Sequence, residues 1–171
     1  HLYDWKGAQT LADTRPLLPA GVELVFVGGT EADVASFKEK NSSDGIRILG
    51  QRPYVEIPSY LKAADVLVLP NSGKTALSRF YTSPMKLFEY MASGTPIVAS
   101  DLPSMREVLS EDNSCLVESD NSLSFAQEIL GLLRDEPRAR DVGVRAASDV
   151  KRYTWQSRAA GIVDFITKKS R

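Results

Sequence analysis

Short apolar runs alternate with longer stretches of helical periodicity through most of this chain, and this alternation restricts the possible folds more than any other feature. The run at residues 65–70, Asp-Val-Leu-Val-Leu-Pro, is apolar at every interior position. A strand without a polar side must be covered on both faces, as in a parallel sheet between helices. Strands that alternate with helices indicate βαβ units with right-handed crossovers. We therefore expect a Rossmann-like, mostly parallel α/β sheet with helices on both faces.

The same patterns give approximate bounds for the elements. We expect strands at residues 23–27, 46–49, 65–70, 96–99 and 115–117. We expect helices at residues 30–40, 56–64, 83–94, 101–109, 122–133, 137–150 and 155–168. Thr30 is predicted to cap the first of these helices, and Ser83 to cap the third, with Pro84 in its first helical position. Residues 71–82 are predicted to form a long loop, which in a compact domain is usually functional or mobile.

Composition excludes several classes of protein. The 171 residues fit one domain, and a net charge of −1 argues against a dedicated nucleic-acid binder. One cysteine and one histidine leave no basis for an internal disulfide, a cysteine-based zinc site or a Ser-His-Asp triad. No apolar run approaches the roughly 20 residues that a membrane-spanning helix needs. We expect a cytoplasmic domain.

Ligands of open parallel sheets bind at the carboxyl ends of the strands, so the residues that follow the strands are the candidates for a site. One of these segments, Ser72–Thr75, resembles the end of a phosphate-binding P-loop. The full motif needs a glycine where this chain has Val68, and it needs a helix directly after the loop. We therefore interpret Lys74 as a solvated loop residue.

Local chemistry leaves two readings open for the most informative charged residues. Lys6 lies at a predicted helix start, where an ammonium suits a bound phosphate but is also an ordinary surface charge. Glu89 could accept hydrogen bonds from a vicinal diol, or it could form a surface pair with Lys86 three residues earlier. Periodicity does not choose between these readings.

The segment that contains Glu89 resembles retaining glycosyltransferases of the glycosyltransferase-B fold, in the family 4 group. Residues 89–98, Glu-Tyr-Met-Ala-Ser-Gly-Thr-Pro-Ile-Val, match the second half of that group's paired-glutamate motif. The other matching segments follow in the family's order: Lys6-Gly7, Gly50 with Pro53, residues 64–70, and Tyr153–Trp155 with Arg158-Ala159. The resemblance covers nearly the whole chain.

The resemblance implies a function for the whole of residues 1–171. They would form a single nucleotide-sugar-binding domain, the C-terminal half of a two-domain enzyme, without its first strand. The enzyme would transfer a sugar from a nucleotide-diphosphate sugar to a saccharide or lipid acceptor and retain the anomeric configuration. It would need no metal or other cofactor. We expect the isolated domain to be inactive, because the acceptor site would lie on the missing N-terminal domain, which would also make any peripheral contact with the inner face of a membrane.

The resemblance also implies roles for individual residues. Lys6 would neutralise the departing diphosphate, and Glu89 would hold the ribose hydroxyls. The other donor-binding positions that the resemblance implies are Gly50, Gln51 and Arg52 near the base, and Ser83, Met85 and Lys86 at the helix start that faces the diphosphate and sugar. Tyr81, near the donor sugar, and His1 are included among the donor-binding residues although they depart from the family pattern.

The chain departs from the family pattern at three positions. Tyr81 replaces the first glutamate of the pair, His1 stands where the family often has arginine, and Pro84 replaces a glycine and offers no N–H. These departures keep a rival open, a non-catalytic nucleotide-binding or regulatory module of the same fold. A flavodoxin-like receiver or flavin domain is a third reading, for which Asp65 and Asp101 are poorly placed.

Overall fold

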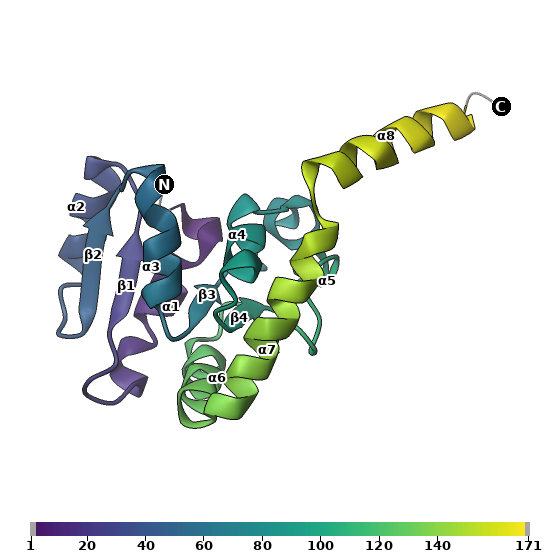
Figure 1. The fold of residues 1–171 in the computed structure, drawn as a ribbon. Helices are drawn as coiled ribbons and strands as arrows, with labels where there is room; N and C mark the ends of the chain where they lie inside the picture. Colours follow the sequence, from purple (N-terminus) through teal and green to yellow (C-terminus); the bar gives the residue numbers. More distant parts are fainter. Residues whose placement is uncertain (1–2, 170–171) are drawn as a thin grey trace.

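A computed structural model of the chain describes residues 3–169 and shows the predicted alternation of strands and helices (Figure 1). The strands are β1 (Leu24–Val27), β2 (Ile46–Gly50), β3 (Leu67–Leu69), β4 (Ile97–Ser100) and β5 (Cys115–Val117). Each falls within one or two residues of a predicted strand, because each run is mostly apolar and is closed by glycine, proline or a polar segment.

The helices also lie close to their predicted positions. The α-helices are α1 (Ala8–Ala12), α2 (Glu31–Lys40), α3 (Ile57–Ala63), α4 (Met85–Ser93), α5 (Pro103–Arg106), α6 (Ser122–Arg134), α7 (Glu136–Asp149) and α8 (Trp155–Lys169). Short 3-10 turns are η1 (Asp4–Lys6), η2 (Arg15–Leu17), η3 (Tyr54–Glu56) and η5 (Val150–Arg152). The predicted loop at 71–82 contains one π-helical turn, η4 (Leu77–Tyr81).

All strand pairs in the described residues are parallel, but they form two hydrogen-bonded sets where the sequence predicts one sheet. β1 pairs with β2, and β4 lies between β3 and β5. No ladder joins β1 to β3, which are seen as separate groups in Figure 1. The strand pattern in a sequence indicates which segments are strands, but it carries no information on which edges meet.

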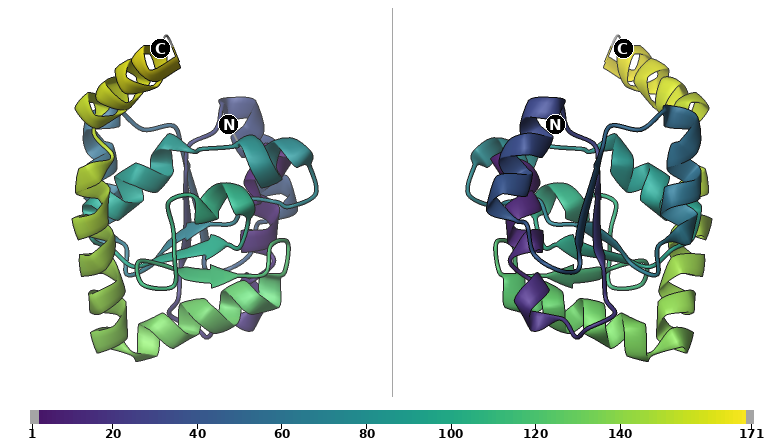
Figure 2. Two further views of the ribbon diagram at one scale, coloured as in Figure 1. Left: turned by 90° about the vertical axis from the view of Figure 1, so that its right-hand side faces the viewer. Right: turned by 90° about the vertical axis from the view of Figure 1, so that its left-hand side faces the viewer.

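Alternate residues of the strands point into two different cores. Val98 of β4 packs into a cluster with Phe26 of β1 and Phe125 of α6, so this cluster spans both strand sets. Ile97 and Ala99 point the other way, into a cluster that α4 and α5 cover. Both faces of β3, β4 and β5 are therefore packed against a core, as their apolar residues predict. On β1 and β2 one face is open: Val25 is 48% exposed, and its partner Arg47 is exposed as well. The ribbons in Figure 2 show helices on both sides of the strands.

The cysteine is part of the first of these cores. Cys115 is buried in β5, and the Arg138 guanidinium lies 3.4 Å from its Sγ atom. Burial, followed by the hydrogen bond to Glu128, raises the pKa of the thiol to about 12.

Helix starts show one correct and one wrong prediction. Thr30 caps α2 as predicted: its hydroxyl accepts from the Asp33 N–H, and the Asp33 carboxylate accepts from the Thr30 N–H. α4, by contrast, begins at Met85, and Pro84 with its extended ψ of 125° occupies the N-cap position. Ser83 therefore does not cap this helix, and Pro84 is not its first helical residue.

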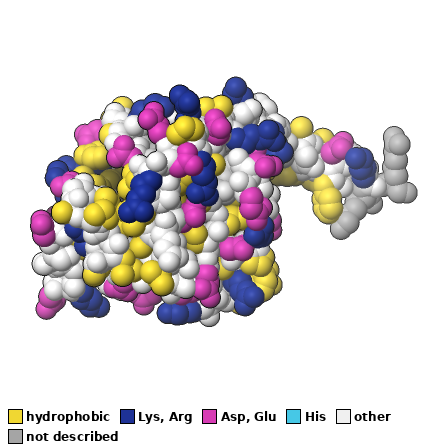
Figure 3. Space-filling view, turned by 90° about the horizontal axis from the view of Figure 1, so that it is seen from below, with side chains coloured by type: hydrophobic (Ala, Val, Ile, Leu, Met, Phe, Trp, Pro, Cys, Tyr) yellow, Lys and Arg dark blue, Asp and Glu magenta, His cyan; other side chains and the backbone are white. Residues whose placement is uncertain are grey.

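The last helix stands apart from the rest. α8 projects from the body in Figures 1 and 3, and its side chains from 155 to 168 are exposed. Trp155, Ile162 and Val163 are among its exposed apolar residues. The body's face in Figure 3, at the amino ends of the strands, mixes dark blue and magenta side chains without a single-sign patch. Within residues 3–169, none of the helices combines the length and the apolar character needed to cross a membrane.

The contact between α7 and the end of α4 requires a glycine at position 143. A Cβ at Gly143 of α7 would lie 2.2 Å from the carbonyl oxygen of Gly94, which ends α4 with a φ of 72°. Gly143→Ala should therefore lower the free energy of unfolding by about 1–3 kcal/mol, because backbone must shift. The matched control is Gly161→Ala in α8, where a Cβ meets nothing within 4 Å. Urea unfolding should show the control unchanged or stabilised by up to about 1 kcal/mol.

Candidate functional site

The candidate site lies at the carboxyl ends of the strands, at the top of Figure 1, and begins with the segment that carries Lys6. The Trp5 carbonyl accepts a hydrogen bond of 2.9 Å from the Ser72 N–H, just after β3. Gly7 adopts a φ of 72°, and a Cβ there would lie 1.6 Å from the Pro70 oxygen. Only glycine permits this approach. Two segments more than sixty residues apart are thereby joined, and Lys6 is held beside the end of β3.

Aromatic rings surround the Lys6 ammonium. Its Nζ atom lies 5.1 Å from the centroid of the Tyr3 ring and 5.5 Å from that of the Trp5 ring. Cation–π contacts of this kind attract an ammonium to the ring faces and help to hold it in place. The lysine is therefore positioned more firmly than a solvated surface side chain.

The start of α4 offers a second positive group. No side chain caps this helix. The first N–H groups of an α-helix have no partner within it, and together with the helix dipole they favour an anion. Met85, the first residue, is exposed, so this end of α4 opens to solvent.

Lys86 adds an ammonium in an unfavourable environment. Burial, and secondarily the charge of Lys6, lowers the pKa of Lys86 to about 8. This repulsion means that the two lysines lie near each other although 80 positions separate them in the sequence. Within the described part of the chain, the Lys86 ammonium forms neither a salt bridge nor a hydrogen bond. Two cations and a helix N-terminus converge here, and an anion would stabilise all three.

Glu89 faces a different neighbour from the one the surface-pair reading requires. Its Oε1 atom accepts a hydrogen bond of 3.1 Å from the Tyr54 hydroxyl of η3. The bond raises the pKa of Tyr54. Among the described residues Glu89 has no ion pair with Lys86, so the reading of these two as a surface pair is wrong.

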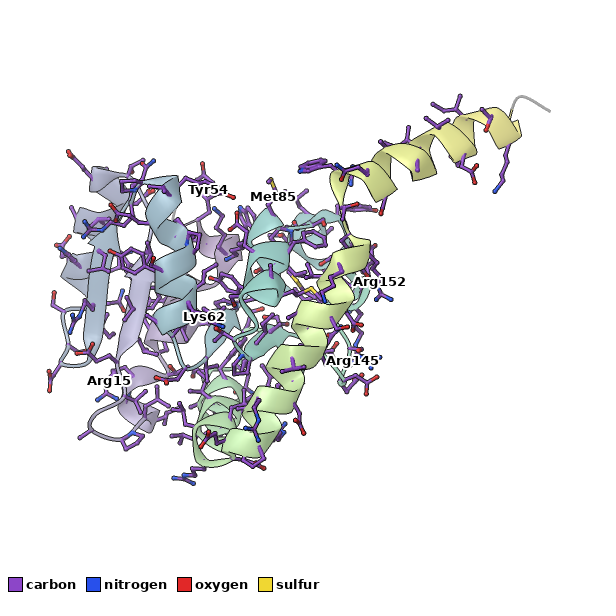
Figure 4. The ribbon with its side chains drawn as sticks, in the orientation of Figure 1. Arg15, Tyr54, Lys62, Met85, Arg145 and Arg152 are labelled. Atoms are coloured by element: carbon purple, nitrogen blue, oxygen red, sulfur yellow. The ribbon has the colours of Figure 1, made fainter. Side chains whose placement is uncertain are left out.

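A groove runs between α3 and α4 below this hydrogen bond. It has a volume of about 490 Å³, which falls within the usual range for small-molecule sites. In Figure 4 Tyr54 lies toward the top of the view and Lys62 lies farther along α3. The residues that line it are Tyr54, Ile57, Pro58, Leu61, Lys62, Glu89, Ala92 and Ser93. The groove is thus largely apolar, with the Glu89 carboxylate in its wall.

The remaining predicted donor-binding residues that the structure describes lie outside the lining of this groove. Gly50 ends β2 with a φ of 69°, and its carbonyl accepts from the Gly28 N–H at 2.7 Å. The residues that follow it, Gln51 and Arg52, are exposed and lead directly to Tyr54. Ser83 and Tyr81 are exposed on the segment before α4. His1 lies outside the described residues.

The loop that resembles a P-loop is already occupied by a carboxylate. Asp120 accepts a hydrogen bond of 2.8 Å from the Gly73 N–H, and its other oxygen lies 3.9 Å from the Lys74 ammonium. The Lys74 side chain is exposed. This arrangement agrees with the prediction that the segment is not a phosphate loop.

Metal ligands are not clustered in the part of the chain that the structure describes. No group of three or more His, Cys, Asp or Glu residues between 3 and 169 could hold a metal ion. Asp101, at the end of β4, is paired with Arg106, which lowers the pKa of the Asp101 carboxyl. It is not part of the acidic cluster that a receiver domain would need.

Comparison with protein families identifies the chain. The family model described as "Glycosyl transferases group 1" matches residues 1–135. The chain belongs to the group 1 glycosyltransferases. The prediction from residues 89–98 is thereby confirmed, and membership of this family favours a transferase over a non-catalytic module.

Two relatives of this group 1 domain are named for inositol compounds. It is 32% identical over 162 residues to a phosphatidyl-myo-inositol mannosyltransferase of Mycolicibacterium smegmatis, covering 92% of this chain and 40% of that protein. It is 27% identical to a D-inositol 3-phosphate glycosyltransferase of Xylanimonas cellulosilytica, covering 93% of this chain and 38% of that protein. The chain therefore spans about two fifths of the length of these relatives.

Solved structures confirm the α/β fold as that of glycosyltransferase-B proteins. HepE of Anabaena, crystallised with UDP, superposes with a TM-score of 0.82 at 21% identity, over 98% of this chain and 47% of that one. The C-terminal domain of the group 1 glycosyltransferase LpcC of Francisella tularensis gives a TM-score of 0.71 at 20% identity, over 88% of this chain and 80% of that one.

Tyr54 is the residue of this region that the sequence analysis missed. It follows Arg52 by two positions, in the segment predicted to lie near the base. An aromatic residue between a strand and a helix is a weak signal of a binding site. The hydrogen bond that gives Tyr54 its position joins residues 35 positions apart, so no local pattern indicates it. Only the packing of α3 beside α4 brings the two together.

Lys86 should reduce the stability of the free protein, because its charged form is disfavoured in the fold. The unfolded chain holds this proton more tightly, so stability should rise between about pH 8 and the ordinary lysine value. Lys86→Met, which keeps most of the side-chain volume, should raise the free energy of unfolding at pH 7 by about 1–3 kcal/mol. It should also remove the rise above pH 8.

The matched control is Lys38→Met, at an exposed position on α2. Urea unfolding at pH 7 and pH 9.5 should show that the free energy of unfolding of Lys38→Met changes with pH as that of the wild type does. A loss of stability in Lys86→Met at pH 7 would contradict the interpretation of Lys86 as a strained cation.

Proposed function

We propose that residues 1–171 form the donor-binding domain of a glycosyltransferase that uses a nucleotide-diphosphate sugar. The observation that carries the proposal is the convergence of Lys6, Lys86 and the uncapped start of α4 next to the Glu89 groove. Group 1 membership and the UDP bound by HepE support it. The full enzyme would transfer a hexosyl group to a saccharide or lipid acceptor and retain its configuration, as the family resemblance implies.

The proposed chemistry is electrostatic. Cleavage of the sugar–phosphate bond places negative charge on the departing diphosphate, and fixed cations and helix N–H groups stabilise such charge without reorganisation. Lys6 and Lys86 would supply the cations, and Met85 and Lys86 would supply free backbone N–H groups. An anion beside Lys86 would also raise its lowered pKa, so that binding would favour the charged form.

Lys6 should act on the diphosphate and not on the nucleoside. Lys6→Ala should weaken the binding of UDP or GDP at least tenfold, or about 1.4 kcal/mol, because one fixed charge is lost. Binding of uridine or guanosine should change little. Isothermal titration calorimetry with UDP and uridine, and with GDP and guanosine, measures both effects.

Lys74→Ala is the matched control, since this lysine lies at the same end of the strands but is exposed and close to Asp120. It should bind UDP or GDP as the wild type does. Equal losses for nucleotide and nucleoside in Lys6→Ala would argue against a diphosphate role, and failure of the wild type to bind any of these nucleotides would end the proposal.

We further propose that the acceptor site lies on a second domain of the full-length enzyme. The two relatives named above are more than twice as long as this chain. Two features of the fold leave surfaces that further chain could cover: the exposed apolar side chains of α8, and the edges of β1 and β3 that form no ladder among the described residues.

The isolated residues 1–171 should therefore bind the donor and fail to transfer its sugar. Product analysis with UDP- and GDP-sugars and a panel of saccharide and lipid acceptors measures this. A longer version of the protein that includes a second domain should show transfer. Robust transfer by residues 1–171 alone would show that the acceptor site is already present.

A further inference from the structure

Tyr54 combines high exposure with a specific hydrogen bond. Its side chain is 76% exposed, and it begins η3 immediately after the exposed residues that follow β2. Its hydroxyl nevertheless reaches across the groove to α4 and donates to Glu89 Oε1 at 3.1 Å. A solvent-exposed aromatic ring is thus held in one place by a single bond to the carboxylate that the proposed function assigns to ribose.

The acceptor capacity of Glu89 is only partly used by this bond. An ionised carboxylate offers about four acceptor positions on its two oxygens. The phenol takes one of them on Oε1, and no other hydrogen bond to Glu89 occurs within the described residues. Tyr54 therefore restricts the rotation of the carboxylate and leaves Oε2 available to a ligand.

The ring of Tyr54 also forms part of the groove wall. Ile57, Pro58 and Leu61 continue this wall along α3, and Glu89 lies on the α4 side. The volume of about 490 Å³ is ample for a nucleoside. A planar base gains about 1–3 kcal/mol from stacking on an aromatic side chain, whatever its identity.

We propose that Tyr54 is a nucleoside-positioning residue: its hydroxyl orients Glu89 toward the ribose diol, and its ring provides a stacking surface for the base. This inference rests on the proposed function and adds a residue and a binding mode to it. Tyr54 is a positioning residue and takes no part in bond cleavage. The proposal predicts that the hydroxyl of Tyr54 affects recognition of the ribose and that its ring affects recognition of the base.

The two contributions can be separated by two substitutions at this position. Tyr54→Phe keeps the ring and removes the hydrogen bond, so it should lower the preference for UDP or GDP over the 2′-deoxy forms by about 3- to 10-fold. Affinity for the deoxy forms should stay the same. Tyr54→Ala removes the ring as well, so it should also weaken binding of the deoxy forms by about tenfold. Calorimetric titration measures all of these affinities.

Three references make the result specific. Glu89→Gln should reduce the same ribose preference, because it weakens the acceptor that Tyr54 orients. Val55→Ala removes an adjacent side chain that is 83% exposed and does not line the groove, and it should have no effect. Inorganic pyrophosphate should bind equally to the wild type and to all of these variants, since it reports only the Lys6 region.

The possible outcomes either support or overturn the role of Tyr54. Wild-type ribose preference in Tyr54→Phe, or unchanged deoxynucleotide binding in Tyr54→Ala, would overturn it. Tighter nucleotide binding in either variant would show that Tyr54 competes with the ligand for Glu89, which also overturns it. In all these cases a loss of UDP or GDP binding in Lys6→Ala would leave the proposed function standing, so the two failures are distinguishable.

Discussion

The placement of Lys86 is the constraint on which the interpretation of this structure depends. An ammonium that is partly removed from water, next to another ammonium and at the positive end of a helix is destabilised by each of these neighbours. Folding alone gives no reason to keep such a residue, because an apolar side chain would pack there at lower free energy. A negatively charged ligand would offset all three effects, which is why the proposed function assigns this position to the diphosphate.

The backbone around Lys6, the second lysine of the site, holds that residue in place. Gly7 lies against Pro70, and Ser72 is hydrogen-bonded to Trp5, so that the Lys6 segment is fixed to the end of β3. Burial of both faces of β3, β4 and β5 leaves the carboxyl ends as the place where loops and helix starts meet. The site is therefore a consequence of the parallel topology, and its charges come from segments far apart in sequence.

Local patterns in the sequence predict most of the fold, because apolar runs and capping residues act over a few positions. Thr30 is a correct example. Pro84 shows the limit: its fixed φ suits a first helical position and an N-cap equally, and only the extended ψ distinguishes them. Long-range geometry was out of reach. The separation of β1 from β3 and the bond between Tyr54 and Glu89 depend on how whole elements pack, which no short segment encodes.

The buried cysteine has a practical consequence for experiments on this domain. A thiol with a pKa near 12 in the protein core carries almost no thiolate at neutral pH, and thiolate is the form that maleimides and oxidants attack. A cysteine introduced on the projecting α8 would be modified in its place. Fluorescent or spin labels could then report on the surroundings of that helix, with no need to remove Cys115 and disturb β5.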